Sequence, residues 1–174
     1  MEVIASAVAN DPRAMVNSDS LAEIVVETDT VEETQHLARR LAESLEPGDF
    51  IALIGPLGAG KTAFVQGIAQ ALKVQGPVTS PTFVLMRLYR GRAPLCHVDA
   101  YRLEGSAEAL VDIGLEDWLD DAVVALEWAD TVIDVLPAQR LEVLLDYAES
   151  GRRIQIRGLG DRASEIVERM AGQR

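Results

Sequence analysis

Cysteine and lysine are scarce in this sequence, which has one cysteine and two lysines among its 174 residues. Because Cys96 stands alone, an internal disulfide and a metal site built from several cysteines are both excluded, which fits a reducing cytoplasm. No stretch contains the roughly 18 consecutive apolar residues of a membrane-spanning helix, so we expect no membrane contact. Residues 1–20 also lack the basic start and apolar core of a secretory signal, and we expect a flexible N-terminal tail there.

Basic residues are outnumbered by acidic ones, 16 to 28, and the formal net charge is −12. The segment from Glu104 to Asp134 contains ten of the acidic residues and neither lysine nor arginine. Broad binding of nucleic-acid phosphates requires clustered positive charge, so we expect any nucleic-acid contact to be indirect. The acidic segment is either a solvated face or a docking surface for a basic partner, and the sequence leaves both interpretations open.

The clearest motif is a glycine-rich stretch of the form G-x-x-x-x-G-K-[ST], which is typical of a phosphate-binding loop. Its residues are Gly55, Pro56, Leu57, Gly58, Ala59, Gly60, Lys61 and Thr62. Glycines let the backbone turn tightly enough for successive N–H groups to point at phosphate oxygens. Lys61 is then placed to reach the β- and γ-phosphates of a nucleotide, and the Thr62 hydroxyl to bind Mg²⁺. The alternative is an ordinary glycine-rich turn.

The residues on either side have the periodicity that a phosphate loop requires. Residues 50–54 are an apolar run of strand length, and residues 62–72 carry apolar side chains at helical spacing. A strand, a loop and a helix in this order aim a helix N-terminus at an anion. The length of the chain suits a single domain, which we place at residues 21–174.

Strand and helix patterns alternate along the rest of the chain. Thr30 and Glu33 form a capping-box signal for a helix that ends before Pro47. We expect strands at 22–26, 83–89, 95–98, 122–126, 141–147 and 152–157, and helices at 106–113, 115–119 and 161–170.

The segment between the loop helix and the next strand carries three hydroxyl residues, Thr79, Ser80 and Thr82. Pro77 and Pro81 exclude a helix here, because proline lacks an N–H and restricts the residue before it. One interpretation is a switch segment in which Thr82 senses the γ-phosphate or its metal. The other is a polar connector, and spacing alone does not choose between them.

Two apolar strands end on carboxylates, Asp99 and Glu127. Asp99 is predicted to lie opposite Thr62 as a second metal-binding residue. Glu127 is predicted either to bind the metal or to activate the attacking water as a general base. Cys96 and His97 are neighbours in a strand and face opposite sides, so they cannot form a nucleophile and base pair. We expect Cys96 in the core, and His97 either buried and hydrogen-bonded or catalytic.

Four separated blocks, read together, resemble the bacterial TsaE family, the small ATPases of tRNA threonylcarbamoyladenosine biosynthesis. The blocks are the phosphate loop, Ser80-Pro81-Thr82-Phe83, the stretch from His97 to Leu103, and Leu126-Glu127-Trp128. The resemblance implies a single α/β domain of the P-loop NTPase type, with three layers and a central mixed sheet flanked by helices. It implies ATP hydrolysis with Mg²⁺, in support of N6-threonylcarbamoyladenosine modification of tRNA by a threonylcarbamoyltransferase and its inactive paralogue.

The resemblance also implies a role for individual residues. Lys61, Asp99 and Glu127 match the catalytic positions, and Thr62, Asp99 and Glu127 match the metal positions. The nucleotide-binding positions are Gly55, Pro56, Leu57, Gly58, Ala59, Gly60, Lys61, Thr62, Ala63 and the switch residue Thr82. For adenine, the turn from Thr28 to Val31 is the candidate.

Two positions depart from the family pattern, which commonly has an acid in place of Pro56 and a second threonine in place of Ala63. Pro56 offers no N–H to a phosphate, and Ala63 offers no hydroxyl. We therefore expect weaker nucleotide binding in this chain than in relatives with the common residues.

Other nucleotide-dependent functions remain alternatives. A GTPase of the familiar type needs an Asn/Thr-Lys-x-Asp motif, which neither lysine provides. A small-molecule kinase needs an acceptor site and a mobile lid, and a nucleotide-gated adaptor needs no hydrolysis of its own. Because Arg87, Arg90, Arg92 and Arg102 lie close in sequence, we expect them near the active face as part of a protein interface.

Overall fold

The computed structural model describes residues 21–103 and 106–172, and the predicted tail at residues 1–20 lies outside this range. Its strands are β1 (Leu21–Thr28), β2 (Phe50–Ile54), β3 (Met86–Tyr89), β4 (Leu95–Asp99), β5 (Val123–Glu127), β6 (Arg140–Tyr147) and β7 (Arg152–Leu159). Its helices are α2 (Val31–Ala42), α3 (Lys61–Ala71), α4 (Ala107–Asp112) and α5 (Asp161–Gly172), with short 3₁₀ turns η1 (Leu115–Trp118) and η2 (Ala129–Val135). None of the helices in this described part is long and apolar enough to cross a membrane.

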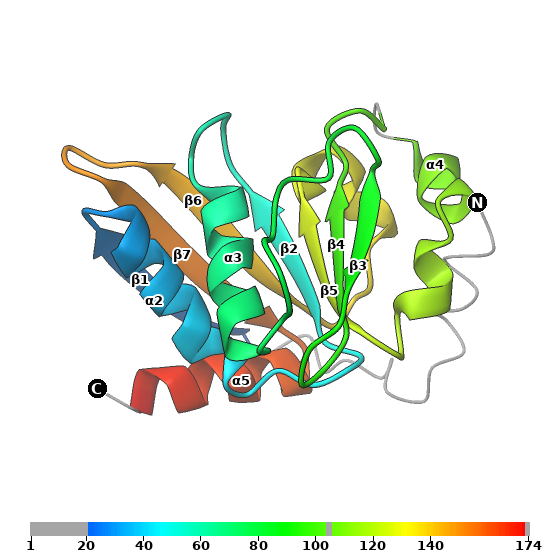
Figure 1. Cartoon of the computed structure of the whole chain (residues 1–174). Helices are drawn as coiled ribbons and strands as arrows, with labels where there is room; N and C mark the ends of the chain where they lie inside the picture. The colour runs from blue at the N-terminus through cyan, green and yellow to red at the C-terminus, as the bar shows by residue number, and fades with distance from the viewer. Residues whose placement is uncertain (1–20, 104–105, 173–174) are drawn as a thin grey trace.

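The strands form one seven-stranded sheet in the order β1-β7-β6-β2-β5-β4-β3. Strands β6, β2, β5 and β4 are parallel to one another, and β1, β7 and β3 join by antiparallel pairing. The mixed α/β sheet expected from the sequence is therefore confirmed. The carboxyl ends of β2, β5 and β4 meet at one edge, which lies at the top of Figure 1.

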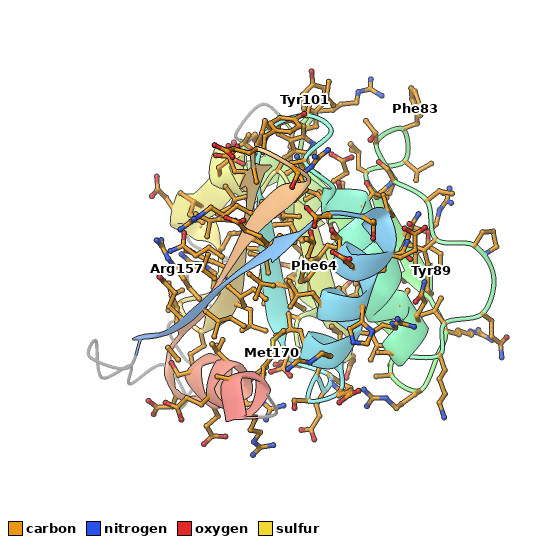
Figure 2. All side chains as sticks on the ribbon, turned by 90° about the vertical axis from the view of Figure 1, so that its left-hand side faces the viewer. Phe64, Phe83, Tyr89, Tyr101, Arg157 and Met170 are labelled. Atoms are coloured by element: carbon orange, nitrogen blue, oxygen red, sulfur yellow. The ribbon has the colours of Figure 1, made fainter. Side chains whose placement is uncertain are left out.

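Helices cover both faces of the central strands, so the domain has three layers (Figure 1). Alternate residues of β2 show why: Ile51 and Leu53 face α2, α3 and α5, whereas Phe50 and Ala52 face the α4, η1 and η2 side. Phe64 of α3, labelled in Figure 2, is fully buried on the first side. Strands buried on both faces read as continuous apolar runs, which is the pattern of residues 50–54.

Helix α2 begins where the capping signal predicts. The Glu33 N–H donates to Thr30 Oγ1 at 3.1 Å, and Glu33 Oε2 accepts the Asp29 N–H at 2.8 Å. The first bond satisfies a donor that the first helical turn leaves unpaired, and the second ties the helix to the residue before its N-cap, Thr30. The helix then buries Leu37 and Leu41 at helical spacing against the sheet and α3.

The strand predicted at 83–89 begins only at Met86. The N–H groups of Val84 and Leu85 both donate to the Pro81 carbonyl, and Leu85 has the left-handed φ of 65°. The Pro81 carbonyl thus accepts the bonds of a turn over the next residues, and the apolar residues in that turn were misread as strand. Phe83 is consequently 89% exposed instead of packed in a sheet.

The expected grouping of arginines at the active face is wrong for Arg90 and Arg92. Both lie in the connection that precedes β4, at the opposite end of that strand from Asp99. The Arg92 guanidinium donates to the carbonyl of Ala42 at 3.0 Å, where α2 ends. Proximity in sequence was misleading because a strand of five residues separates its two ends by about 16 Å.

Helices α2 and α3 pack so closely that Gly67 has no room for a side chain. A Cβ there would lie 2.4 Å from the Gln35 carbonyl oxygen and 2.7 Å from the Ala38 Cβ. Glycine to alanine in a helix usually stabilises, but we predict that Gly67→Ala lowers the free energy of unfolding by about 1–3 kcal/mol through overpacking. Urea denaturation measures this, with Gly172→Ala in α5, where nothing lies within 4 Å, as the control. Equal stability of the Gly67→Ala and wild-type proteins would contradict the packing.

Candidate functional site

The glycine-rich stretch connects the end of β2 to the first residue of α3. Gly60 is the N-cap of α3 and has φ 105°, a conformation that strains other residues. Gly55 has φ 152°, and a Cβ there would lie 2.2 Å from the Leu145 carbonyl oxygen. The loop therefore turns tightly against β6 and presents the N-terminus of α3, which is a favourable place for a phosphate group.

Lys61 lies folded over the loop and is only 4% exposed. Its ammonium donates to the carbonyls of Gly55 at 2.6 Å and Pro56 at 2.9 Å. The nitrogen also lies 3.6 Å from the ring centroid of Trp128, which covers it. Burial lowers the pKa of Lys61 below its ordinary value, and nearby carboxylates, of which Glu127 contributes most, oppose that shift.

Glu127 is buried at the end of β5 and is held by two side chains. The Thr62 hydroxyl lies 2.9 Å and 3.1 Å from its two oxygens, and His97 Nε2 lies 2.8 Å from Oε1. A carboxylate accepts hydrogen bonds, so the ring carries its proton on Nε2. His97 Nδ1 is buried and finds no hydrogen-bond partner among the described residues. His97 is thus buried and hydrogen-bonded, the first of the two alternatives that the sequence offered.

Asp99, at the end of β4, binds the hydroxyl-rich segment. Its Oδ2 accepts hydrogen bonds from Ser80 Oγ at 3.0 Å and Thr82 Oγ1 at 2.5 Å, and its Oδ1 accepts the Tyr101 N–H at 3.0 Å. The β4–β5 register pairs Asp99 with Glu127, so the two carboxylates lie on adjacent strands. In this structure, Thr62 contacts Glu127, whereas Thr82 contacts Asp99.

The oxygen groups at this edge suit a magnesium ion bound together with a nucleotide. Thr62 supplies a hydroxyl and Glu127 and Asp99 supply carboxylates, which are the hard ligands that Mg²⁺ prefers. Within the described ranges, no three His, Cys, Asp or Glu side chains gather into a metal-binding group. A Mg²⁺ site of one or two carboxylates completed by phosphates and water needs no such group.

Sequence reasoning assigned no role to four further residues that lie at the site. Trp128 covers the Lys61 ammonium, and the Tyr101 ring packs against Trp128 in a tilted arrangement with ring centroids 4.9 Å apart. Tyr147 and Arg152 contact the outside of the phosphate loop from β6 and β7. The sequence did show the Glu-Trp pair and predicted the hairpin of residues 141–147 and 152–157. The contacts of these residues with the loop join positions about 70 to 90 apart in sequence, and no local pattern predicts such contacts.

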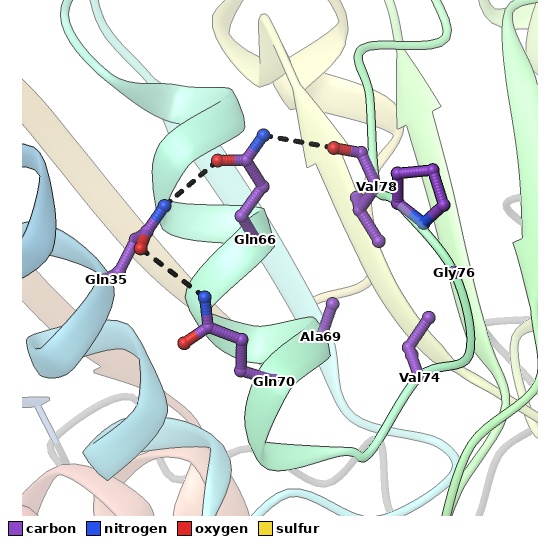
Figure 3. Close-up of a pocket in the computed structure, with 8 residues that line it drawn as sticks. Gln35, Gln66, Ala69, Gln70, Val74, Gly76 and Val78 are labelled. Carbon is purple, nitrogen blue, oxygen red and sulfur yellow. Dashed lines mark hydrogen bonds between the residues drawn. The ribbon is translucent and has the colours of Figure 1, made fainter.

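A separate pocket lies beside α3 and the segment that leads to Thr79 (Figure 3). Three amide side chains cross it: Gln35 Nε2 donates to Gln66 Oε1 at 3.0 Å, and Gln66 Nε2 donates to the Val78 carbonyl at 3.0 Å. Gln70 also reaches Gln35, at 3.4 Å. The lining contains no titratable side chain, so this pocket offers polar contacts and no acid or base.

Comparison with known proteins associates this arrangement with one family. The profile of the family described as "Threonylcarbamoyl adenosine biosynthesis protein TsaE" matches residues 28–154. The tRNA threonylcarbamoyladenosine biosynthesis protein TsaE of Streptomyces coelicolor is 40% identical over 147 residues, which are 79% of this chain and 99% of that protein. The protein of the same name from Mycobacterium tuberculosis is 46% identical over 125 residues, 67% of this chain and 74% of that protein.

A solved structure gives the same result for the fold. The crystal structure of Bacillus subtilis YdiB superposes with a TM-score of 0.77 at 30% sequence identity, and the match covers 88% of this chain and 97% of that one. The fold of the chain is therefore shared with a solved structure over nearly the full length of both.

Cys96, on β4, faces the apolar side opposite to His97 and is fully buried. Burial raises the pKa of its thiol to about 12, so almost no nucleophilic thiolate forms in the folded protein.

We predict that Ellman's reagent at pH 8 labels the native protein at least about 1,000-fold more slowly than urea-unfolded protein. Because the chain has one cysteine, the labelling rate reports on Cys96 alone. Similar rates for the two states would show that Cys96 is accessible.

Proposed function

Since the chain belongs to the TsaE family of threonylcarbamoyl adenosine biosynthesis proteins, we propose that it is a cytoplasmic ATPase. It binds and hydrolyses ATP with Mg²⁺ in support of the N6-threonylcarbamoyladenosine modification of tRNA. A threonylcarbamoyltransferase and its inactive paralogue carry out that modification as protein partners, and contact with tRNA is indirect. The observation that carries the proposal is the hydrogen bond from Thr62 of the phosphate loop to the buried Glu127, because it joins a phosphate site to a base.

The loop and α3 bind the phosphates in this proposal. The N-terminus of α3 presents unpaired N–H groups to an anion, and Lys61 adds a positive charge next to them. Lys61 already lies over the loop through its bonds to Gly55 and Pro56, so a small movement brings the ammonium to a phosphate oxygen. Trp128 covers this position and limits the access of water, which strengthens electrostatic contacts there.

Glu127 is the general base of the proposed reaction. His97 and Thr62 both contact the carboxylate, so its orientation is fixed before a water molecule reaches it. Oε1 receives the His97 bond, which leaves Oε2 the more available oxygen for the proton of the water. A bound Mg²⁺ ion would neutralise developing phosphate charge, with Thr62, Glu127 and Asp99 as the residues that would hold it.

The switch segment connects the site to the protein surface. Ser80 and Thr82 are hydrogen-bonded to the buried Asp99, and the next residue, Phe83, is almost fully exposed and projects outward in Figure 2. When a ligand group reaches Asp99 or its neighbours, the two hydroxyls exchange partners and the exposed turn shifts with them. This arrangement supports a role in which the state of the nucleotide is read by another protein.

The roles of the two strand-end acids are separated by conservative variants. We predict that Glu127→Gln lowers the hydrolysis rate by about 100-fold or more, since the amide cannot accept the proton. Retained ATP binding in this variant identifies Glu127 mainly as the base, whereas a loss of the Mg²⁺ dependence of binding identifies it chiefly as a metal ligand. Asp99→Asn is expected to weaken the Mg²⁺ dependence of ATP binding. Calorimetric titration and phosphate release measure the two effects, with Glu168→Gln on the exposed face of α5 as the control. Unchanged hydrolysis in both variants would remove these acids from the reaction.

Coupling to the partners is tested in a reconstituted modification reaction. With the threonylcarbamoyl-transferring proteins, tRNA and ATP present, we expect repeated rounds of modification with the wild-type chain, and ATP turnover faster than that of the chain alone. Lys61→Ala should reduce modification to about a single round, because the phosphate charge is no longer neutralised. Lys73→Ala, which removes the other lysine at an exposed position, is the matched control. Full tRNA modification with the Lys61→Ala chain would contradict the ATPase role. Repeated tRNA modification with the wild-type chain but without ATP hydrolysis would favour the nucleotide-gated adaptor.

A small-molecule kinase is the other alternative. That function predicts phosphate transfer to an added acceptor in place of release to water. Phosphate release by the wild-type chain with and without candidate acceptors distinguishes the two reactions.

A further inference from the structure

Three consecutive carbonyls of the phosphate loop accept hydrogen bonds from one hairpin. The Tyr147 hydroxyl donates to the Leu57 carbonyl at 2.6 Å. The Arg152 guanidinium donates from Nη2 to the Gly58 carbonyl at 2.9 Å and from Nε to the Ala59 carbonyl at 3.1 Å. The outer half of the loop is thus fixed from a part of the chain about 90 positions away in sequence.

The hairpin is built to hold these two side chains together. The β6–β7 register places Tyr147 directly opposite Arg152, as the last pair before the turn. The guanidinium carbon lies 4.6 Å from the centroid of the Tyr147 ring, and Nη1 donates to the Gly151 carbonyl at 2.7 Å. All three guanidinium nitrogens therefore bind backbone carbonyls, which positions Arg152 as a support for the loop.

The geometry of the peptide group connects these bonds to ligand binding. In a trans peptide, the carbonyl of one residue and the N–H of the next point in opposite directions. Bonds that hold the Leu57 and Ala59 carbonyls toward the hairpin thus direct the N–H groups of Gly58 and Gly60 away from it. The Ala59 N–H closes the loop on the Pro56 carbonyl at 3.2 Å. Because Pro56 has no N–H, the loop has fewer N–H donors for a phosphate than a loop without proline, and the orientation of the remaining donors matters more.

We propose that Tyr147 and Arg152 are positioning residues that hold the phosphate loop in its binding conformation for a nucleoside triphosphate. The inference rests on the proposed function of this loop and adds to it the part of the chain that orders it. Without the two side chains, the loop samples other conformations, and a ligand must order it on binding. The free energy needed to order the loop lowers the affinity for the nucleotide, whereas the chemistry at Glu127 is unchanged.

Nucleotide affinity and turnover are the first measurements. Relative to wild type, we expect Arg152→Ala to raise the dissociation constant for ATP with Mg²⁺ by about tenfold and Tyr147→Phe, which keeps the ring, by about threefold. Turnover at saturating ATP should stay within about twofold in both. Arg153→Ala is the matched control, because Arg153 is the next residue of β7, its side chain is 60% exposed, and it forms a 3.7 Å ion pair with Glu27, away from the loop. Wild-type affinity in both variants would overturn the proposal.

The exchange of the Ala59 amide hydrogen, followed by NMR without nucleotide, is the second measurement. Ala59 is buried and its N–H is bonded within the loop, so we expect exchange about tenfold faster in both variants and unchanged rates in β4. Unchanged exchange, or faster exchange with wild-type affinity, would overturn the positioning role. If the wild-type chain binds no ATP, the proposed function fails, whereas the exchange rates still test whether the hairpin holds the loop. Urea unfolding of Tyr147→Phe and Arg152→Ala separates a local effect from a general loss of stability.

Discussion

Parallel pairing of three strands is the constraint on which the site depends. The register places Leu53 of β2, Glu127 of β5 and Asp99 of β4 in one row across the sheet. The phosphate loop begins two residues after Leu53, so the loop and both acids meet at the same edge. Because parallel strands end together at their carboxyl ends, groups that are far apart in sequence reach one small region without any side chain having to span the sheet.

The two carboxylates in this row are buried, and buried carboxylates need hydrogen-bond donors. Glu127 and Asp99 are 3% and 2% exposed, and a buried carboxylate is costly unless it accepts hydrogen bonds. His97 and Thr62 supply those bonds to Glu127, and the hydroxyl-rich segment supplies them to Asp99. The bonds that stabilise the acids in the folded chain are therefore also the bonds that connect the loop, the hydroxyl-rich segment and the strands.

The antiparallel pair formed by β6 and β7 restrains the phosphate loop. Strands β6 and β7 carry Tyr147 and Arg152 at their turn, and the Leu145 carbonyl lies against Gly55. The loop is consequently confined by the helix that follows it and by the hairpin beside it. A phosphate loop built largely of small residues has little side-chain packing of its own, so its conformation comes from such neighbours.

Local patterns in the sequence predicted the phosphate-loop motif and most of the helices and strands, and the combined motifs, through their resemblance to a family, predicted the class of fold. The capping signal at Thr30 located the start of α2, and the apolar run at 50–54 located a central strand, because both depend on contacts within a few residues. Where a turn competed with an apolar run, at Phe83, the pattern misled. Only the tertiary structure decided which side chains meet: that His97 binds Glu127, that Arg92 lies away from the active edge, and that Tyr147 and Arg152 hold the loop. These contacts depend on strand order and register, which long-range packing selects and local periodicity does not encode.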